Sequence, residues 1–228
     1  MGVRELIRQL DIGAGLFMTE PQVRDVLREA GISVAEAMVA HTVQEAIAAA
    51  DATGFPVLLK PVTRRSDKDP RPSLVSRAEV RKAFRGLISE AQVEGVSVMK
   101  APRPGVELIV EVYHDPLFGP VLAFGFGRLA VEVWGDVAYR IVPINEKDAR
   151  LMIREPRAQR LLQGYANLEA PRAPLVEETL LRVSKLVEDN PEIWKLQLSP
   201  VYAYRDQVMV VDAAVELRQP GTTTTEPR

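Results

Sequence analysis

The sequence predicts an α+β fold made of two α/β lobes with a mixed sheet, and three features of the chain support this prediction. Short helical and extended patterns alternate over about the first 90 residues. From about residue 95 the hydrophobic pattern changes to a period of two, which is typical of half-buried strands. Helical patterns return near residue 146 and are followed by two final strands. At 228 residues the chain can form one large domain or two small ones.

The first part of the chain begins with a short helix inside an extension at 1–17. The main body starts at Thr19, because Thr19 and Gln22 have the spacing of a capping box. Gly31 ends this helix, since glycine readily takes the left-handed conformation. The elements expected next are a strand near 34–39, a helix at 43–52, a buried strand at 56–62, a charged surface loop at 63–73 and a helix at 78–91.

The period of two in the middle of the chain predicts antiparallel strands, and the hairpin turn Asp115-Pro-Leu-Phe-Gly119 joins two of them. The five strands expected here lie at 96–100, 106–113, 120–127, 129–134 and 139–144. Helices then follow at 146–154, 156–163 and 175–189, and two strands at 194–198 and 208–215 close the domain. The Thr-rich tail at 220–228 is predicted to be disordered.

Composition excludes several classes of function. The net charge of -2 gives no reason to expect a nucleic-acid partner. The chain has no cysteine, which excludes disulfides, thiolate catalysis and Cys-ligated metal. No run reaches the ~20 apolar residues of a membrane helix, and the N-terminus lacks the pattern of a signal peptide or a myristoylation site. We therefore expect a cytoplasmic protein with neither a membrane nor a nucleic-acid partner.

Two charged residues stand at the ends of apolar strands. Lys60 is either a phosphate-binding residue or a lysine that extends to solvent. Asp212 follows Val-Met-Val-Val, where an acid indicates a site, although it could instead cap a turn. His41 and His114 are the only histidines, and neither has the nearby acid or nucleophile that catalysis requires.

Four stretches of the sequence resemble one known family. They are 19–32, which begins Thr-Glu-Pro-Gln-Val-Arg; Gly54-Phe-Pro-Val-Leu-Leu-Lys60; the central segments at 105–110, 115–121 and 124–140; and the closing pair Trp194-Lys-Leu-Gln-Leu-Ser-Pro and Val210-Val-Asp-Ala. Together they resemble, over 18–217, the β subunit of nucleoside-diphosphate-forming acyl-CoA synthetases, including succinyl-CoA synthetase. The resemblance implies an ATP-grasp fold, a first lobe at 18–95, a second lobe at 96–217, and a CoA-binding α subunit as partner.

The resemblance also implies a nucleotide site between the lobes, which would bind ATP or ADP. Lys60 would reach the nucleotide phosphates, Glu107 would lie near the sugar, and Met99 would pack on the base unless it is a core methionine. Glu132 and Arg140 resemble a family pair near the phosphate site or the α-subunit dock, and they could also form a plain cross-strand pair. No residue of this chain is assigned a catalytic role.

Magnesium is the second cofactor that the resemblance implies. Asp212 matches a magnesium ligand of the family, and Ser199 stands where the family has the asparagine of an Asp-x-Asn-Pro motif, which here reads Gln197-Leu-Ser-Pro200. Magnesium prefers carboxylates and other hard oxygens, so this change removes one preferred ligand and alters another.

Two further departures fall on the phosphate chemistry. The loop after Lys60 has Arg64 at the histidine position of the family and lacks its glycines, and Gly127-Arg128 replaces a Gly-Gly pair. A cradle of backbone N–H groups needs such glycines. Two functions therefore follow from the sequence. The chain is either a β-like subunit of an ADP-forming acid–CoA ligase, or a degenerate, non-catalytic ATP-grasp protein that scaffolds or regulates an α-like partner.

Overall fold

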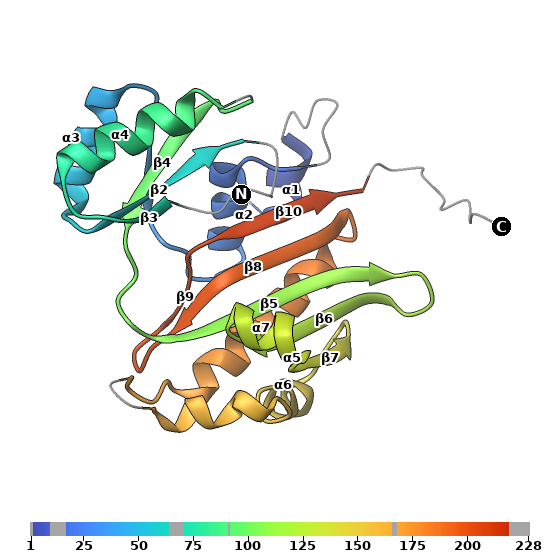
Figure 1. Ribbon diagram of the computed structural model, residues 1–228. Coiled ribbons are helices and arrows are strands. Elements are labelled where there is room, and N and C mark those ends of the chain that lie inside the picture. The colour runs from blue at the N-terminus through green and yellow to red at the C-terminus, as the bar shows by residue number, and fades with distance from the viewer. Residues whose placement is uncertain (1, 10–16, 64–70, 91, 166–167, 219–228) are drawn as a thin grey trace.

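The computed structural model describes residues 2–9, 17–63, 71–90, 92–165 and 168–218. Part of the N-terminal extension, most of the charged loop and the Thr-rich tail lie outside these residues. The described chain contains two separate sheets, with the first two helices, α1 (Val3–Gln9) and α2 (Glu20–Glu29), beside the second (Figure 1). Within this part of the chain no helix is both long and apolar enough to cross a membrane.

The first lobe is a four-stranded sheet in the order β1-β4-β2-β3. Its strands are β1 (Ala37–Ala40), β2 (Val57–Val62), β3 (Arg71–Leu74) and β4 (Gly95–Lys100). Two helices, α3 (Val43–Thr53) and α4 (Arg77–Ile88), cover one face. Both start at a capped residue, because the side chains of Thr42 and Ser76 accept hydrogen bonds from the backbone N–H three residues later. The alanines of α3 let it pack closely on the sheet.

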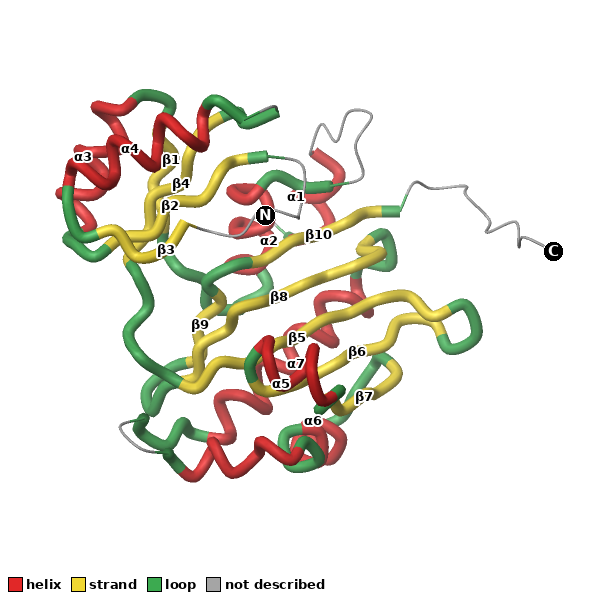
Figure 2. The backbone as a smooth tube through the Cα atoms, viewed as in Figure 1, coloured by secondary structure: helices red, strands yellow, loops and turns green. Residues whose placement is uncertain are grey.

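The second lobe is a six-stranded sheet in the order β10-β8-β5-β6-β7, with β9 paired to β8 (Figure 2). The bounds are β5 (Val106–Asp115), β6 (Gly119–Phe126), β7 (Val137–Ile141), β8 (Ile193–Ala203), β9 (Val208–Val210) and β10 (Ala213–Leu217). Together with α2, the helices α6 (Glu146–Met152) and α7 (Ala173–Asp189) bury one face, while η1 (Arg157–Gln163) packs at its margin. The opposite face carries one short helix, α5 (Arg128–Trp134) (Figure 1).

Most local predictions are confirmed. The N–H of Thr19 donates to Gln22 Oε1 at 2.8 Å, as the capping box requires, and Gly31 has a φ of +72°. The carboxylate of Asp115 accepts hydrogen bonds from two backbone N–H groups of the β5–β6 turn.

The predicted strand at 129–134 is wrong, because these residues form α5. Its short apolar run of Leu, Ala, Val and Trp fits a strand as well as a helix, so the pattern alone could not decide. Gly127, with a φ of +64°, turns the chain out of β6, and left-handed Gly135 ends the helix. Gly125 of β6 has no side chain where Val131 of α5 packs against the sheet.

Three smaller predictions also change. Arg71–Leu74 pairs with β2 where a loop was expected, and the single strand predicted at 208–215 is divided into β9 and β10. All the named strands pair antiparallel, and within the described part of the chain the parallel component of the predicted mixed sheet is reduced to one bridge between Val34 and Val210.

The two lobes meet through a small apolar contact of Leu58, Met99 and Val211. Because β4 pairs within the four-stranded sheet, we propose that the first lobe ends after Lys100, rather than at residue 95. The segment 101–105 then connects the lobes, as the green trace at the left of Figure 1 shows.

Candidate functional site

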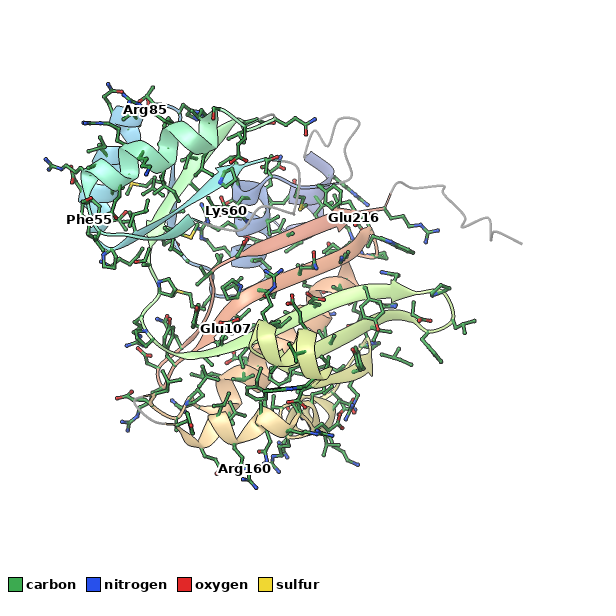
Figure 3. All side chains as sticks on the ribbon, in the orientation of Figure 1. Phe55, Lys60, Arg85, Glu107, Arg160 and Glu216 are labelled. Carbon is green, nitrogen blue, oxygen red and sulfur yellow. The ribbon has the colours of Figure 1, made fainter. Side chains whose placement is uncertain are left out.

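Lys60 and Asp212 form an ion pair between the lobes. Lys60 lies near the middle of β2 on the face that α3 and α4 leave uncovered, and Asp212 lies between β9 and β10 (Figure 3 labels Lys60). Their side chains are only 11% and 15% exposed. The prediction that Lys60 could extend to solvent is therefore wrong, and both residues occupy one site.

The electrostatic surroundings of this pair are unusual. Burial raises the pKa of the Asp212 carboxyl above its ordinary value, while Lys60 opposes this shift. Next to Lys60, in register on β4, the hydroxyl of buried Ser97 donates to Glu20 Oε2 at 2.6 Å. Glu20 in turn pairs with Arg24 on α2. Charged groups from α2 and from both sheets thus converge where the lobes meet.

A cavity of about 380 Å³ opens beside Asp212 on the second lobe. Its polar lining from the sheet comprises Glu111, Gln197, Ser199 and Asp212. The strands hold these residues in register, because Glu111 of β5 lies opposite Gln197 of β8, and the Ser199 N–H donates to the Asp212 carbonyl at 3.1 Å. The predicted metal-binding residues Ser199 and Asp212 therefore share one cavity.

The donor set of this cavity fits a magnesium ion that is only partly held by protein. Carboxylate, hydroxyl and amide oxygens are the hard ligands that Mg²⁺ prefers, and Mg²⁺ usually keeps several waters and shares phosphate ligands. The described residues contain no group of three or more acids or histidines that could hold a metal by themselves. The fit is therefore to a cation bound together with a nucleotide.

The short helix α5 forms the outer wall of the cavity. Glu132 and Arg128 both line it, and Arg128 Nε donates to Glu132 Oε1 at 2.7 Å. The Arg128 N–H also donates to Glu107 Oε1 at 3.2 Å, so Glu107 anchors the start of α5. Glu107 itself lies outside the lining, at the end of β5 nearest the segment that connects the lobes (Figure 3).

Of the other residues predicted for the site, Met99 and Arg140 do not line this cavity. Met99 is buried in the contact between the lobes, as the core alternative predicted. The predicted cross-strand pair of Glu132 and Arg140 is wrong, because Glu132 lies on a helix and contacts Arg128. Arg140 instead donates to Glu155, and this hydrogen bond raises the Arg140 pKa and lowers the Glu155 pKa.

Sequence reasoning overlooked Glu111, Glu20 and Ser97. For Glu111 a signal existed, because the period of two in Val-Glu-Leu-Ile-Val-Glu places Glu107, Ile109 and Glu111 on one face of β5. The roles of Glu20 and Ser97 had no local signal, since their contact depends on the packing of α2 against the first lobe.

Comparison with known proteins agrees with this architecture. The family described as ATP-grasp domain matches residues 14–217. The chain is 35% identical over 216 residues to "Acetate--CoA ligase [ADP-forming] II subunit beta" of Pyrococcus furiosus, a match that covers 88% of this chain and 92% of that protein. It is 38% identical over 198 residues to "Acetate--CoA ligase [ADP-forming] I" of Archaeoglobus fulgidus, covering 82% of this chain but only 29% of that longer protein.

A solved structure of an acetyl-coenzyme A synthetase from Ca. Korarchaeum cryptofilum superposes with a TM-score of 0.88 at 34% identity. The match covers 95% of this chain and 100% of that one, whose crystals contained coenzyme A and Ca-AMPCP. A second structure of that enzyme was solved with coenzyme A and Mg-AMPPCP, and with its phosphohistidine segment pointing towards the nucleotide binding site. Its TM-score is 0.79 at 32% identity, over 95% of this chain and 100% of that one.

Proposed function

The chain belongs to the ATP-grasp domain family, and from this membership we propose that it is a β-subunit-like component of an ADP-forming acid–CoA ligase. It binds ATP or ADP with Mg²⁺ and acts with a CoA-binding α subunit. The observation that carries the proposal is the match to a separate β subunit. This match covers 88% of this chain and 92% of that subunit.

Lys60 and Asp212 are suited to exchange partners when the nucleotide binds. The buried ammonium group of Lys60 offers a point charge to the phosphates, and the Asp212 carboxylate, with the Ser199 hydroxyl, offers hard oxygens to Mg²⁺. Bound Mg²⁺ would neutralise charge on the phosphate oxygens. The interlobe ion pair thus keeps both groups charge-compensated before the ligand arrives.

An exposed apolar surface supports the proposed partner. Of the twelve large hydrophobic residues that are exposed within the described chain, seven come from the β5–β6 hairpin, α5 and β7. They are Tyr113, Leu117, Phe118, Val133, Trp134, Tyr139 and Ile141. This surface adjoins the cavity, because α5 contributes both Glu132 to the cavity and Trp134 to the surface. Such a gathering of apolar groups marks an interaction site, here for the α subunit.

The non-catalytic alternative predicts the same fold but a different outcome on mixing with the α subunit. The curated relatives are named as ligases or ligase subunits, which favours the catalytic function. The altered residues Gln197 and Ser199 nevertheless lie in the cavity itself, so activity must be measured on this chain.

The test is co-purification with the cognate α subunit, followed by titration calorimetry with ATP or ADP and Mg²⁺. We expect nucleotide binding and formation of acyl-CoA from an organic acid, CoA and ATP. Lack of nucleotide binding, by the chain alone and in the complex, contradicts the proposal. Binding of both nucleotide and partner without acyl-CoA formation supports the scaffolding alternative.

A further inference from the structure

Position 197 lacks a carboxylate, and the structure brings one to the same place from the neighbouring strand. Gln197 of β8 stands where the resembled family has the aspartate of its Asp-x-Asn-Pro motif. Glu111 of β5 is the direct cross-strand partner of Gln197, and both side chains point into the cavity that Ser199 and Asp212 also line.

The ends of the two side chains lie in contact. Gln197 Nε2 donates to Glu111 Oε1 at 3.4 Å, so the Glu111 carboxylate lies within reach of the space that an acid at position 197 would use. Within the described residues, no lysine or arginine forms an ion pair with Glu111. A half-buried carboxylate that lines a cavity without a cationic partner favours a bound cation.

The spacing of the strands decides how Glu111 can act. Glu111 lies on β5 and Asp212 beside β10, with β8 between them, and strands are about 4.8 Å apart, so the two backbones are roughly 10 Å apart. The carboxylate of Glu111 contacts Gln197, one strand away from Asp212, rather than Asp212 or Ser199, and this offset indicates how Glu111 can act. It suits a carboxylate that accepts hydrogen bonds from the waters Mg²⁺ retains.

We propose that Glu111 replaces, from β5, the carboxylate that position 197 has lost, and that it holds the water shell of the divalent cation bound at Asp212 and Ser199. Glu111 is thus a positioning residue rather than a ligand of the cation. The inference rests on the proposed function, because that function supplies the cation. It also explains how the cavity keeps a carboxylate near position 197 in a chain that has Gln197 and Ser199 there.

The experiment measures Mn²⁺ affinity by titration calorimetry, with and without ADP, for four forms of the full chain. They are the wild type, Glu111→Gln, the double variant Glu111→Gln with Gln197→Asp, and Glu216→Gln as control. Glu216 of β10 carries the same charge on the same sheet but lies outside the cavity lining (Figure 3). Circular dichroism and thermal unfolding establish that each variant folds.

We expect Glu111→Gln to weaken Mn²⁺ binding about 10- to 100-fold, which is the usual effect of losing a carboxylate behind a metal site. Gln197→Asp should restore most of that loss in the double variant, whereas Glu216→Gln should leave the affinity unchanged. Unchanged Mn²⁺ affinity in Glu111→Gln, an equal loss in Glu216→Gln, or no recovery of affinity when Gln197→Asp is added, overturns the role of Glu111 alone. A wild type that binds neither ADP nor Mn²⁺, both alone and with its α subunit, overturns the proposed function as well.

Discussion

The ammonium group of Lys60 contacts the carboxylate of Asp212 across 152 residues of sequence, and this ion pair joins the two lobes at the candidate site. Lys60 comes from the sheet of the first lobe, and Asp212 from the turn between the last two strands of the second. A salt bridge this buried is costly to break on one side, because the remaining charge is left without compensation.

Replacing Lys60 by methionine should therefore lower the free energy of unfolding by about 3–5 kcal/mol and abolish binding of ADP with Mg²⁺. The double variant Lys60→Met with Asp212→Asn should recover part of the stability, since it removes both charges, but none of the nucleotide binding. Denaturant unfolding and titration calorimetry measure the two effects. The exposed pair of Arg77 and Asp51 is the control, and Arg77→Gln should cost no more than about 1 kcal/mol. If Lys60→Met and Arg77→Gln lowered the free energy of unfolding equally, burial would not be what makes the Lys60–Asp212 pair costly to break.

Gly125→Ala should displace α5 from the sheet. A Cβ at Gly125 would come within 2.4 Å of Val131 Cγ2 and 3.1 Å of the Asp136 carbonyl, so the helix must move. We expect a loss of about 1–3 kcal/mol of stability from overpacking, and weaker cation binding because Glu132 shifts with α5. Gly86→Ala is the matched control. Gly86 lies in α4 with open space around it, and alanine there should stabilise the protein by about 0.5–1 kcal/mol.

Tyr204 should resist ionisation at alkaline pH. The side chain is 4% exposed, its hydroxyl donates to the Arg103 carbonyl at 3.0 Å, and burial raises its pKa from 10.0 to about 12. Between these two values the unfolded chain loses the phenolic proton while the folded chain keeps it. The contribution of Tyr204 to the free energy of unfolding therefore falls as the pH rises from 10.0 to about 12.

Ultraviolet difference titration of the wild type against Tyr204→Phe should isolate one phenol that titrates near pH 12. Stability measured over the same range should fall less steeply in the Phe variant. A difference spectrum that titrates at the ordinary value of 10.0 would show that the tyrosine is accessible to water.

Ile141→Lys should prevent association with the α subunit and leave the isolated chain folded. Ile141 lies on the edge strand β7 within the exposed apolar surface, so a charge there is solvated in the free chain and buried without a partner in the complex. Val75→Lys replaces an exposed apolar residue of the first lobe and should leave association intact. Size-exclusion chromatography of the mixed subunits distinguishes them, and co-elution of the Ile141 variant would place the interface elsewhere.

Much of the fold could be predicted because the signals are local. Thr19 and Gln22 set a helix start, Gly31 ends that helix, and Asp115 forms a hairpin turn, each through contacts only a few residues apart. The prediction at 129–134 was wrong for a related reason. Its apolar run satisfies either secondary structure, and the absence of a side chain at Gly125, on the preceding strand β6, lets the helix pack there.

By itself, the sequence determined most of the succession of helices and strands, the resemblance over 18–217 and the choice of Lys60, Ser199 and Asp212 as candidate site residues. Each of these depends on residue type, periodicity or motif spacing along the chain. Only the tertiary structure decided that Lys60 and Asp212 form a pair, that Glu132 and Arg140 do not, and that Glu111 faces Gln197. Those relationships depend on strand register and on the packing of one lobe against the other. Both are set by residues that are distant in sequence and come together only in the folded chain.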